Sequence, residues 1–443
     1  MFDPSTPSLF DPLIAEGLTT LQLRHDWRSG DTCALAGRQW DSGRRFARYG
    51  RDFDHETLPA RGVQLDAEAT LELYRQRGCL EPLERAFELL RQGRHQGVDC
   101  WLHGETRVLS NMHSNAMGLD NGRHALRAGG IRRHDPSDPE EEVLVDGLNL
   151  ARAMSFKNVG ANIPYGGSKI CVHAAPVPLD DLETLGFLAW CITRSRCFTG
   201  PDMGFSPEHA DVLREHFTRH IVGGPGGALG PTGGPTAEGV LLALREAARH
   251  HLGRPLREAS VAVQGLGAVG GPLARLLLAE GVTRLLVADA DTERIRSFVE
   301  TPAEVLEPGQ ILSSEVDIVS PNAVGSVLGP EEIDRLRCRI VMGAANNQLR
   351  ASSREGELEL AERLAERGIL YQVDWVHNGA GVLAGREEWE HRQEASMDRV
   401  REQLAQVCGQ GVRQNLEAAR EAGVTPTAMA YRRAEGLIYR RDA

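Results

Sequence analysis

One stretch near the middle of the chain constrains the fold more than any other: residues 260–291, SVAVQGLGAVGGPLARLLLAEGVTRLLVADAD. It reads as a strand, a turn with glycines in the spacing GxGxxG, a helix, and a second strand that ends at Asp289. The glycines Gly265, Gly267 and Gly270 permit a tight turn, close approach of the backbone to a pyrophosphate, and close packing of the helix. The stretch therefore predicts a Rossmann-type α/β domain that binds a dinucleotide.

The acid at the end of the second strand favours NAD over NADP. Asp289 is placed to accept hydrogen bonds from the ribose hydroxyls of the adenosine half. Asp291 lies close by, and the sequence shows no arginine directly beside the strand end, so a 2'-phosphate would be repelled. We expect Ala268 and Val269 of the turn to line the same cofactor site.

Lysine is almost absent from this chain. Of its 50 lysine and arginine residues, only Lys157 and Lys169 are lysines. Arginine has therefore replaced lysine wherever a surface positive charge suffices, and these two positions need a compact ammonium or an amine that can lose its proton when buried. Both lie in the run MSFKNVGANIPYGGSK, separated by a glycine turn, and we predict lysine chemistry there.

The pattern along the chain predicts two main domains with a cleft between them. The segment GGPGGALGPTGG at 223–234 has too much glycine for a core element and predicts a hinge. We expect an N-terminal extension of unknown role at 1–80, an α/β substrate domain at 81–235, and a Rossmann NAD-binding domain at 236–414. The C-terminal helical segment at 415–443 is expected to rejoin the substrate domain. Its final helix is predicted to begin at Thr425, the N-terminal cap, followed by Pro426.

The helix that leads to Lys157 is predicted to begin near Glu140 and to run to about Met154, as EEEVLVDGLNLARAM is amphipathic. Three polar residues just before it are candidates for its N-terminal cap: Asp135, Ser137 and Asp138.

Composition excludes several classes of function. A net charge of −12 argues against nucleic acid and against a polybasic membrane contact. The N-terminal residues lack a signal-peptide pattern, and no stretch has the length of a membrane span, so a cytoplasmic protein is expected. The eight cysteines contain no CxxC pair, so we expect reduced thiols and no bound metal.

The lysine segment resembles the substrate-domain signature of the glutamate/leucine/phenylalanine/valine (amino-acid) dehydrogenases, with the leucine/phenylalanine type nearest in pattern. The resemblance extends from about Leu80 to the C-terminus. It implies a homo-oligomer that interconverts an L-amino acid with its 2-oxo acid and ammonia, using NAD. Further motifs of the family lie in order along the chain, namely GGIR with Gly129 and Gly130, FTGPDMG with Asp202, PTAEG with Thr236, SPNAVG with Asn322 and Ala323, GAANNQL with Asn346 and Asn347, and HNGAGV with Asn378, Gly381 and Val382.

The resemblance assigns a role to each charged residue, and the physical chemistry agrees. Lys157 is expected to pair with the substrate carboxylate. Lys169, desolvated and next to a second cation, is expected to act as a general base toward water. Asp202 is expected to move protons to and from the amine. Arginine at either lysine position would stay charged and would fail as a base.

The substrate is expected to be apolar. Glutamate enzymes of the family carry a lysine directly before the glycine pair, where this chain has Ala128, although Arg127 beside it could substitute. Compared with the branched-chain enzymes, Ala128, Gly200 and Gly385 each remove volume from the pocket. A larger pocket favours an aromatic amino acid such as phenylalanine, with leucine, valine or glutamate as alternatives.

Two readings from other classes stay open on the sequence. A non-catalytic NAD-binding homologue would be expected to have lost Lys157, Lys169 or Asp202, and all three are present. A 2-hydroxy-acid dehydrogenase would be expected to place a histidine base after the nucleotide domain, whereas here the candidate residues precede it.

Overall fold

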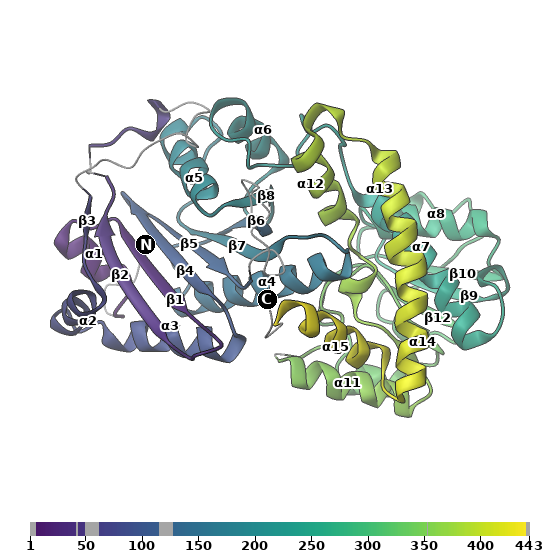
Figure 1. Cartoon of the computed structure of the whole chain (residues 1–443). Helices are drawn as coiled ribbons and strands as arrows, with labels where there is room; N and C mark the ends of the chain where they lie inside the picture. The colour runs from purple at the N-terminus through teal and green to yellow at the C-terminus, as the bar shows by residue number, and fades with distance from the viewer. Residues whose placement is uncertain (1–5, 41–42, 49–61, 115–126, 352, 440–443) are drawn as a thin grey trace.

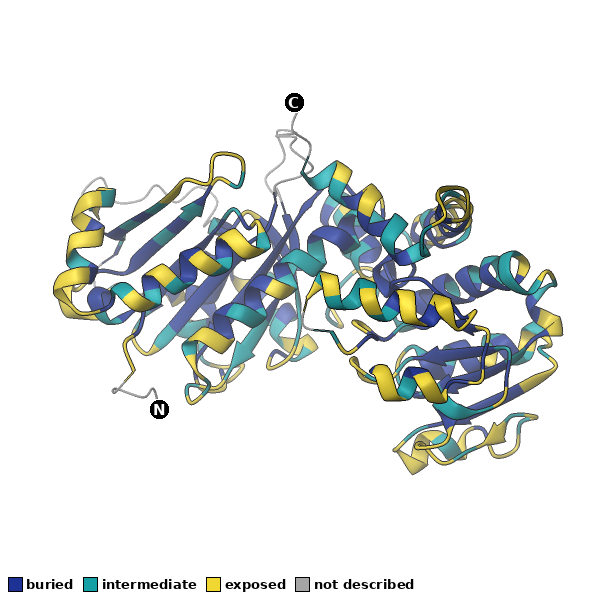
Figure 2. Cartoon of the chain, turned by 90° about the horizontal axis from the view of Figure 1, so that it is seen from below, coloured by how far each residue is buried: buried dark blue, intermediate teal, exposed yellow. Residues whose placement is uncertain are grey.

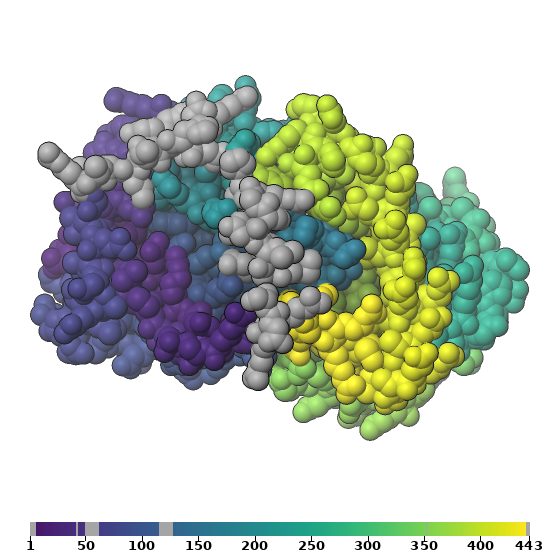
Figure 3. All heavy atoms as spheres, viewed as in Figure 1, coloured from purple at the N-terminus to yellow at the C-terminus, as the bar shows by residue number. Residues whose placement is uncertain are grey.

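The computed structural model describes residues 6–40, 43–48, 62–114, 127–351 and 353–439. The chain forms two lobes, each built around one β-sheet, with the C-terminal helices between them and beside the second sheet (Figures 1 and 3). Strands of both sheets are mainly buried, and exposed residues gather on the outward faces of helices (Figure 2). This arrangement confirms the predicted α/β class with two sheets. Within the described ranges, no helix combines the length and apolar character needed to cross a membrane.

The first sheet has eight strands in the order β3-β2-β1-β4-β5-β7-β6-β8. The strands β6, β7 and β8 run parallel, and the other neighbours pair antiparallel. The bounds of the strands are β1 Thr20–His25, β2 Thr32–Arg38, β3 Val63–Gln64, β4 Gly97–His103, β5 Thr106–Met112, β6 Arg127–His134, β7 Gly166–His173 and β8 Cys197–Pro201.

Helices cover both faces of this sheet. Buried residues of the first four helices form one apolar cluster with β1, β2, β4 and β5, whereas α5 and α6 pack on the opposite face. The bounds of these helices are α1 Asp11–Glu16, α2 Ala67–Gln76, α3 Leu80–Gly93, α4 Glu140–Gly160, α5 Leu182–Arg194 and α6 Pro207–His216. The predicted N-terminal extension thus contributes β1, β2 and β3 to the sheet of the first lobe, with β1 paired to β4.

The second sheet is a fully parallel, six-stranded sheet in the order β11-β10-β9-β12-β13-β14. Its strands are β9 Ser260–Gln264, β10 Arg284–Ala288, β11 Glu304–Val305, β12 Ile318–Pro321, β13 Ile340–Val341 and β14 Leu370–Tyr371. The strand order, which runs outward on both sides of β9, is that of a doubly wound nucleotide-binding fold.

One face of this second sheet packs on α7, α8, α14 and α15, and the other packs on α10 and α11. The helices of this half are α7 Gly233–Ala247, α8 Gly270–Glu280, α9 Thr292–Arg296, α10 Pro330–Arg335, α11 Arg354–Glu366, α12 Ala380–His391, α13 Met397–Leu404, α14 Val412–Ala422 and α15 Pro426–Ile438. The predicted N-terminal cap of the last helix is confirmed, because Thr425 Oγ1 accepts a hydrogen bond of 3.2 Å from the Ala428 amide.

The last helix also reaches back to the first lobe. Tyr431 of α15 lies edge-on against Phe156 of α4, with ring centroids 5.1 Å apart. Tyr439, just after the helix, donates or accepts a hydrogen bond of 2.8 Å with His113 and lies 5.3 Å from the ring of Trp27. The predicted domain boundaries themselves stay predictions.

The helix α4 differs from its prediction in two respects. It continues past Met154 to Gly160, and this extension carries Lys157. Its N-terminal cap is Pro139, and no side chain caps it, so the predicted capping residues were wrong. Asp135, Ser137 and Asp138 instead hydrogen-bond among themselves in the preceding turn, which occupies their side-chain oxygens.

The glycine-rich linker is held by carboxylates on both sides. Glu388 of α12 accepts hydrogen bonds from the amides of Gly223 and Leu229, at 2.7 and 3.1 Å. Asp211 of α6 accepts two from the amide of Gly226, at 3.0 and 3.1 Å. Residues from each side of the linker therefore bind it, and hinge motion remains a prediction.

Candidate active site

Lys169 and Asp202 form the centre of the candidate site. Lys169 lies in β7, and its ammonium donates a hydrogen bond to Oδ2 of Asp202, which directly follows β8. A Cβ atom at Gly130 of the neighbouring β6 would lie only 2.9 Å from Lys169 Nζ. A glycine at that position therefore leaves the room that the ammonium occupies.

The carboxylate of Asp202 is bound on both oxygens. Its Oδ2 also accepts a hydrogen bond of 3.2 Å from Nε of Arg132, and its Oδ1 accepts one of 2.8 Å from the amide of Met203. Burial raises the pKa of Asp202, but the charges of Lys169 and Arg132 and these hydrogen bonds bring it below its ordinary value. The group is therefore an anion at neutral pH.

Lys157 reaches the same place from the end of α4. Its Nζ donates a hydrogen bond of 2.9 Å to Oδ1 of Asn346, a residue of the nucleotide-binding half. Loss of hydration lowers the pKa of Lys157, and the nearby charge of Lys169 acts in the same direction, whereas Asp374 and Asp202 oppose the shift. The two lysines of the chain are thus brought near each other, each beside a different polar partner.

Asp374 is a site residue that the sequence analysis missed. It is buried, and its carboxylate accepts hydrogen bonds from the Asn347 amide at 3.2 Å and from Nδ2 of Asn378 at 3.1 Å. The same Nδ2 donates to Asn346 Oδ1 at 3.0 Å, so these residues form a connected chain to Lys157. Burial raises the pKa of Asp374, and the charge of Lys157 opposes that rise. An acid inside an apolar run directly before HNGAG was the available signal.

The predicted pocket walls lie together. Ala128 of β6 pairs with Phe198 of β8, and Gly200 lies two residues further along the same strand. A Cβ at Gly385 of α12 would be 3.4 Å from Val222 and 3.5 Å from Phe198. The three small residues therefore border one apolar cluster, as the predicted pocket requires. Gly129 is needed for a different reason, namely close contact between strands, because a Cβ there would lie 2.0 Å from the carbonyl oxygen of Ser168 in β7.

Aromatic rings complete this cluster, and the sequence analysis did not identify them. Phe198 and Trp389 stack with ring centroids 5.8 Å apart and planes 12° apart, and Tyr165 meets Phe198 edge-on at 5.1 Å. His220 lies against Trp389 at 4.8 Å. Val382 packs against the apolar cluster between α12, α13 and the end of α4, and its role as a pocket wall stays a prediction.

The nucleotide turn has the geometry that its glycines predict. Gly265 has φ of 86°, and a Cβ there would lie 2.7 Å from Ala323. A Cβ at Gly270, the first residue of α8 after Val269, would lie 1.9 Å from the Gly265 carbonyl oxygen. Gly267 faces open space apart from one Arg294 nitrogen at 3.5 Å. Gly265 and Gly270 thus allow the tight turn and close packing, and Gly267 leaves the backbone open to a pyrophosphate.

One predicted cofactor residue, Asn322, borders the same turn, and another, Thr236, lies in the helix that contacts it. Asn322 follows β12, and its amide donates to the Gln264 carbonyl at 2.7 Å. Thr236 lies in the first turns of α7, and its hydroxyl donates to the carbonyl of Thr232 at 2.8 Å. A Cβ on Gly233, where α7 begins, would lie 2.2 Å from the Ala268 carbonyl oxygen, so α7 and the turn are in close contact.

The surroundings of Asp289 correct one expectation. Asp289 accepts hydrogen bonds from the amides of Leu266 and Asp291, at 2.6 and 2.8 Å. An arginine does stand beside the strand end, because Arg294 lies 3.5 Å from Asp289 and 3.3 Å from Asp291. The first turn of α9 folds it back over the two acids, an approach that the linear sequence does not show. Its charge is shared between two carboxylates.

Comparison with known proteins identifies the family. The model for glutamate/leucine/phenylalanine/valine dehydrogenases matches residues 282–438. A leucine dehydrogenase of Thermoactinomyces intermedius is 36% identical over 251 residues, which are 55% of this chain and 66% of that protein. An L-tryptophan dehydrogenase of Nostoc punctiforme is 32% identical over 368 residues, which are 80% of this chain and 96% of that protein.

Structural comparison agrees with the sequence comparison. The crystal structure of L-tryptophan dehydrogenase from Nostoc punctiforme superposes with a TM-score of 0.67 and 29% identity, covering 80% of this chain and 98% of that chain. The chain therefore belongs to the glutamate/leucine/phenylalanine/valine dehydrogenase family and is an NAD-dependent oxidoreductase that acts on an amino acid.

Proposed function

We propose that this enzyme reversibly oxidises an L-amino acid with an aromatic side chain to its 2-oxo acid and ammonia. The observation that carries the proposal is the meeting of both lysines with Asp202 at one place, next to an apolar cluster of aromatic rings. Lys157 can pair with the substrate carboxylate, Asp202 can exchange a proton with the amine, and Lys169 can activate water. The aromatic rings can contact the substrate side chain.

Each charged group has one task in the proposed reaction. Lys157 leaves Asn346 and pairs with the substrate carboxylate, which is the stronger acceptor. Asp202 accepts a proton from the substrate ammonium, so that the free amine electron pair can assist removal of the Cα hydride. The product of that step is the iminium of the amino acid.

Hydrolysis of the iminium requires a base. Lys169 in its neutral form takes a proton from water as the water oxygen bonds to the former Cα. Asp202 returns its proton to the nitrogen, and the carboxylate so formed accepts the hydroxyl proton of the carbinolamine as the carbonyl forms and ammonia leaves.

The cofactor would be held by the turn from Gly265 to Gly270, by Asp289 at the ribose, and by Thr236, Asn322 and Ala323 around the nicotinamide half. A Cβ at Gly265 or Gly270 would clash with Ala323 or with the Gly265 carbonyl oxygen, so the turn must stay tight, and the open space in front of Gly267 fits a pyrophosphate. When bound there, NAD supplies the hydride acceptor.

An apolar substrate is supported by the position of Arg127. Its guanidinium donates a hydrogen bond of 2.9 Å to the Ser195 carbonyl, and the side chain is buried. Adjacent residues of a strand point to opposite faces, so Arg127 points away from the face on which Ala128 borders the pocket. Arg127 is therefore a poor substitute for the lysine that would hold a glutamate side chain.

An aromatic substrate is supported by the stacked rings of Phe198 and Trp389 and by the three small residues beside them. Offset or edge-to-face contact with these rings would stabilise a phenyl or indole group by about 0.5–1.5 kcal/mol beyond its buried area. The likeness to an L-tryptophan dehydrogenase over most of its length points the same way. A branched-chain substrate is the second candidate, because a leucine dehydrogenase is 36% identical.

The test is NAD reduction with each of the twenty L-amino acids, compared between the wild type and Gly385→Val. We expect the highest kcat/KM with phenylalanine or tryptophan in the wild type. Valine at 385 would press against Val222 and Phe198, so the variant should lose aromatic activity and retain or gain aliphatic activity. A wild type that prefers leucine or valine contradicts the aromatic assignment, and one that uses no amino acid contradicts the proposed reaction.

The homo-oligomer and the cytoplasmic location expected from the sequence stay predictions. Light scattering after gel filtration measures the mass of the particle directly, and a monomer of 48.4 kDa would contradict the first of them.

A further inference from the structure

A row of polar side chains continues from the candidate site beneath α4. In β6 and β7, Arg132 pairs with Cys171 and His134 pairs with His173. Because side chains alternate between the faces of a sheet, Lys169, Cys171 and His173 share one face. This is the face covered by α4, since Cys171 belongs to the apolar cluster that includes residues of α4.

Arg132 connects the site to α4. Its Nε and one terminal nitrogen lie 3.2 Å from Oδ2 of Asp202, and its other terminal nitrogen lies 3.1 and 3.3 Å from the two oxygens of Asp146. Asp202 in turn binds Lys169. A planar guanidinium can hold two carboxylates in fixed directions, whereas a lysine ammonium is a single point charge.

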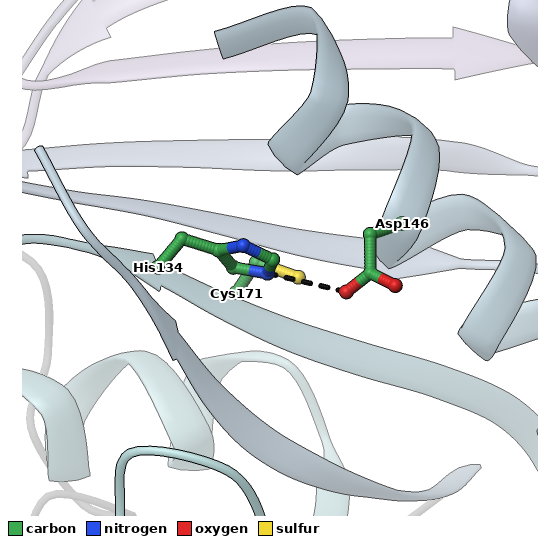
Figure 4. A group of neighbouring side chains, drawn as sticks. All are labelled: His134, Asp146 and Cys171. Carbon is green, nitrogen blue, oxygen red and sulfur yellow. Dashed lines mark ion pairs between the residues drawn. The ribbon is translucent and has the colours of Figure 1, made fainter. Parts of the chain in front are cut away.

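His134 ends the row. Its Nε2 lies 3.2 Å from Oδ2 of Asp146 and its Nδ1 lies 3.8 Å from Asp138. The dashed line in Figure 4 marks the ion pair with Asp146. Burial raises the pKa of Asp146, but the hydrogen bond from His134 and the charge of Arg132 bring it below its ordinary value. Asp146 is thus a second anion, placed on the far side of Arg132 from the first.

Cys171 completes the group drawn in Figure 4. A ligand atom from each of His134, Asp146 and Cys171 lies within 4.8 Å of the others, which is a spacing that a metal ion could use. Burial, however, raises the pKa of the Cys171 thiol to about 12, and Arg132 already neutralises Asp146. We therefore interpret the group as the end of an ion-pair row with alternating charges.

We propose that Arg132 and Asp146 are positioning residues for the reaction, which fix the Asp202 carboxylate against Lys169 and set the charge that Lys169 experiences. The inference rests on the proposed role of Lys169 as the base. Arg132 favours the neutral amine, and Asp146 reduces that effect by sharing the guanidinium. The row therefore has two effects: it adjusts how easily Lys169 accepts a proton, and it keeps Asp202 ionised.

The titratable and charged groups around this row come from three elements and two connecting segments. They are Arg132 and His134 of β6, Cys171 and His173 of β7, Asp146 and Lys157 of α4, Asp202 after β8, and Asp138 before α4.

Opposite substitutions should move the titration of Lys169 in opposite directions. Asp146→Asn removes an anion and leaves the whole charge of Arg132 facing the pair, so the midpoint should fall. Arg132→Gln removes a cation and frees Asp202 to bind Lys169 alone, so the midpoint should rise. We expect shifts of about one pH unit each, and near cancellation in the double variant.

The scarcity of lysine gives a direct measurement. A protein labelled with 13C at lysine Cε has only two lysine side-chain signals, and Lys157→Arg assigns them. Titration of the Lys169 signal is independent of turnover, so it distinguishes failure of this inference from failure of the proposed reaction. The acid limb of kcat/KM should move with the signal if Lys169 is the base.

Matched controls separate charge from general disturbance. Arg133→Gln removes a cation from the other face of the same strand, and Asp138→Asn removes an acid that contacts His134 but not Arg132. Both should leave the Lys169 midpoint in place. Arg132→Lys keeps the charge but cannot hold both carboxylates, so the midpoint should stay while kcat falls about tenfold.

Melting temperatures and NAD affinity are measured for every variant. If Arg132→Gln fails to fold, Asp146→Asn and Arg132→Lys still decide the question. The inference is overturned if folded Asp146→Asn leaves the Lys169 midpoint unchanged, or if it moves the midpoint no further than Asp138→Asn does. It is also overturned if Arg132→Lys retains the full kcat.

Discussion

Replacing Gly130 with alanine should impair the reaction far more than it impairs the fold. The added Cβ would lie 2.9 Å from Lys169 Nζ, 3.3 Å from the Gly200 carbonyl oxygen and 3.7 Å from Asp202 Cβ. Ordinary contacts of a Cβ atom begin at 3.4 Å, so the ammonium must move by about half an ångström or more. The ammonium is the end of a flexible side chain, whereas the backbone contact needs only a slight adjustment.

We expect a large loss of catalytic rate and a small loss of stability. A displacement of about 1 Å at a reacting group can reduce the rate by about a hundredfold, so we expect kcat to fall by roughly ten- to a hundredfold. Overpacking costs about 1–3 kcal/mol, and we expect the lower end because Lys169 Nζ can yield. That corresponds to a decrease in melting temperature of about 2–4 °C.

Steady-state kinetics and thermal unfolding of the same preparations provide the test. Gly234→Ala is a suitable control, because a Cβ there meets no heavy atom within 4 Å. Gly130→Ala with near-full kcat would show that the position of Lys169 Nζ does not limit the reaction. A variant that fails to fold would show that the strand, and not the lysine, requires the glycine.

Lys169→Arg should reduce kcat by about a hundredfold or more while NAD binding survives, whereas Lys157→Arg should mainly raise KM for the amino acid. Steady-state kinetics and fluorescence titration of NAD distinguish these two effects. Near-full turnover of Lys169→Arg would contradict the role of Lys169 as base. Asp289→Ser should weaken the use of NAD and improve that of NADP, and a wild type with equal rates for both cofactors would refute our interpretation of Asp289. Small-angle scattering should show a more compact particle with NAD and substrate together, and identical profiles would count against a hinge in the glycine-rich linker. Burial raises the pKa of Glu357, which accepts a hydrogen bond from the hydroxyl of Tyr431, from 4.5 to about 7. Because the unfolded chain loses this proton at a lower pH than the folded chain, the free energy of unfolding should fall as pH rises between these values. Glu357→Gln should remove that fall in urea unfolding series, and parallel pH curves for both proteins would contradict it.

The sequence by itself determined the local features of this protein. The turn from Gly265 to Gly270 could be predicted because the positive φ of Gly265 and the close contact of Gly270 with the Gly265 carbonyl oxygen involve residues of one short segment. The N-terminal cap at Thr425 is local for the same reason. The functional weight of Lys157 and Lys169 was visible because lysine occurs nowhere else in the chain.

Only the tertiary structure decided how distant residues meet. The pairing of β6 with β7 and β8 puts Gly130 beside Lys169 and points Arg132 at Asp202. The packing of α4 on that sheet then brings Asp146 to Arg132.

The same holds for the residues that the sequence analysis missed. Trp389 reaches Phe198 because α12 packs on β8, and Asp374 lies near Lys157 because the two halves of the chain touch there. β1 joins the sheet by pairing with β4, a contact that no local pattern showed. Strand register and helix packing arise from burial of apolar surface between segments far apart in the chain, so a periodicity within one segment does not encode its partner.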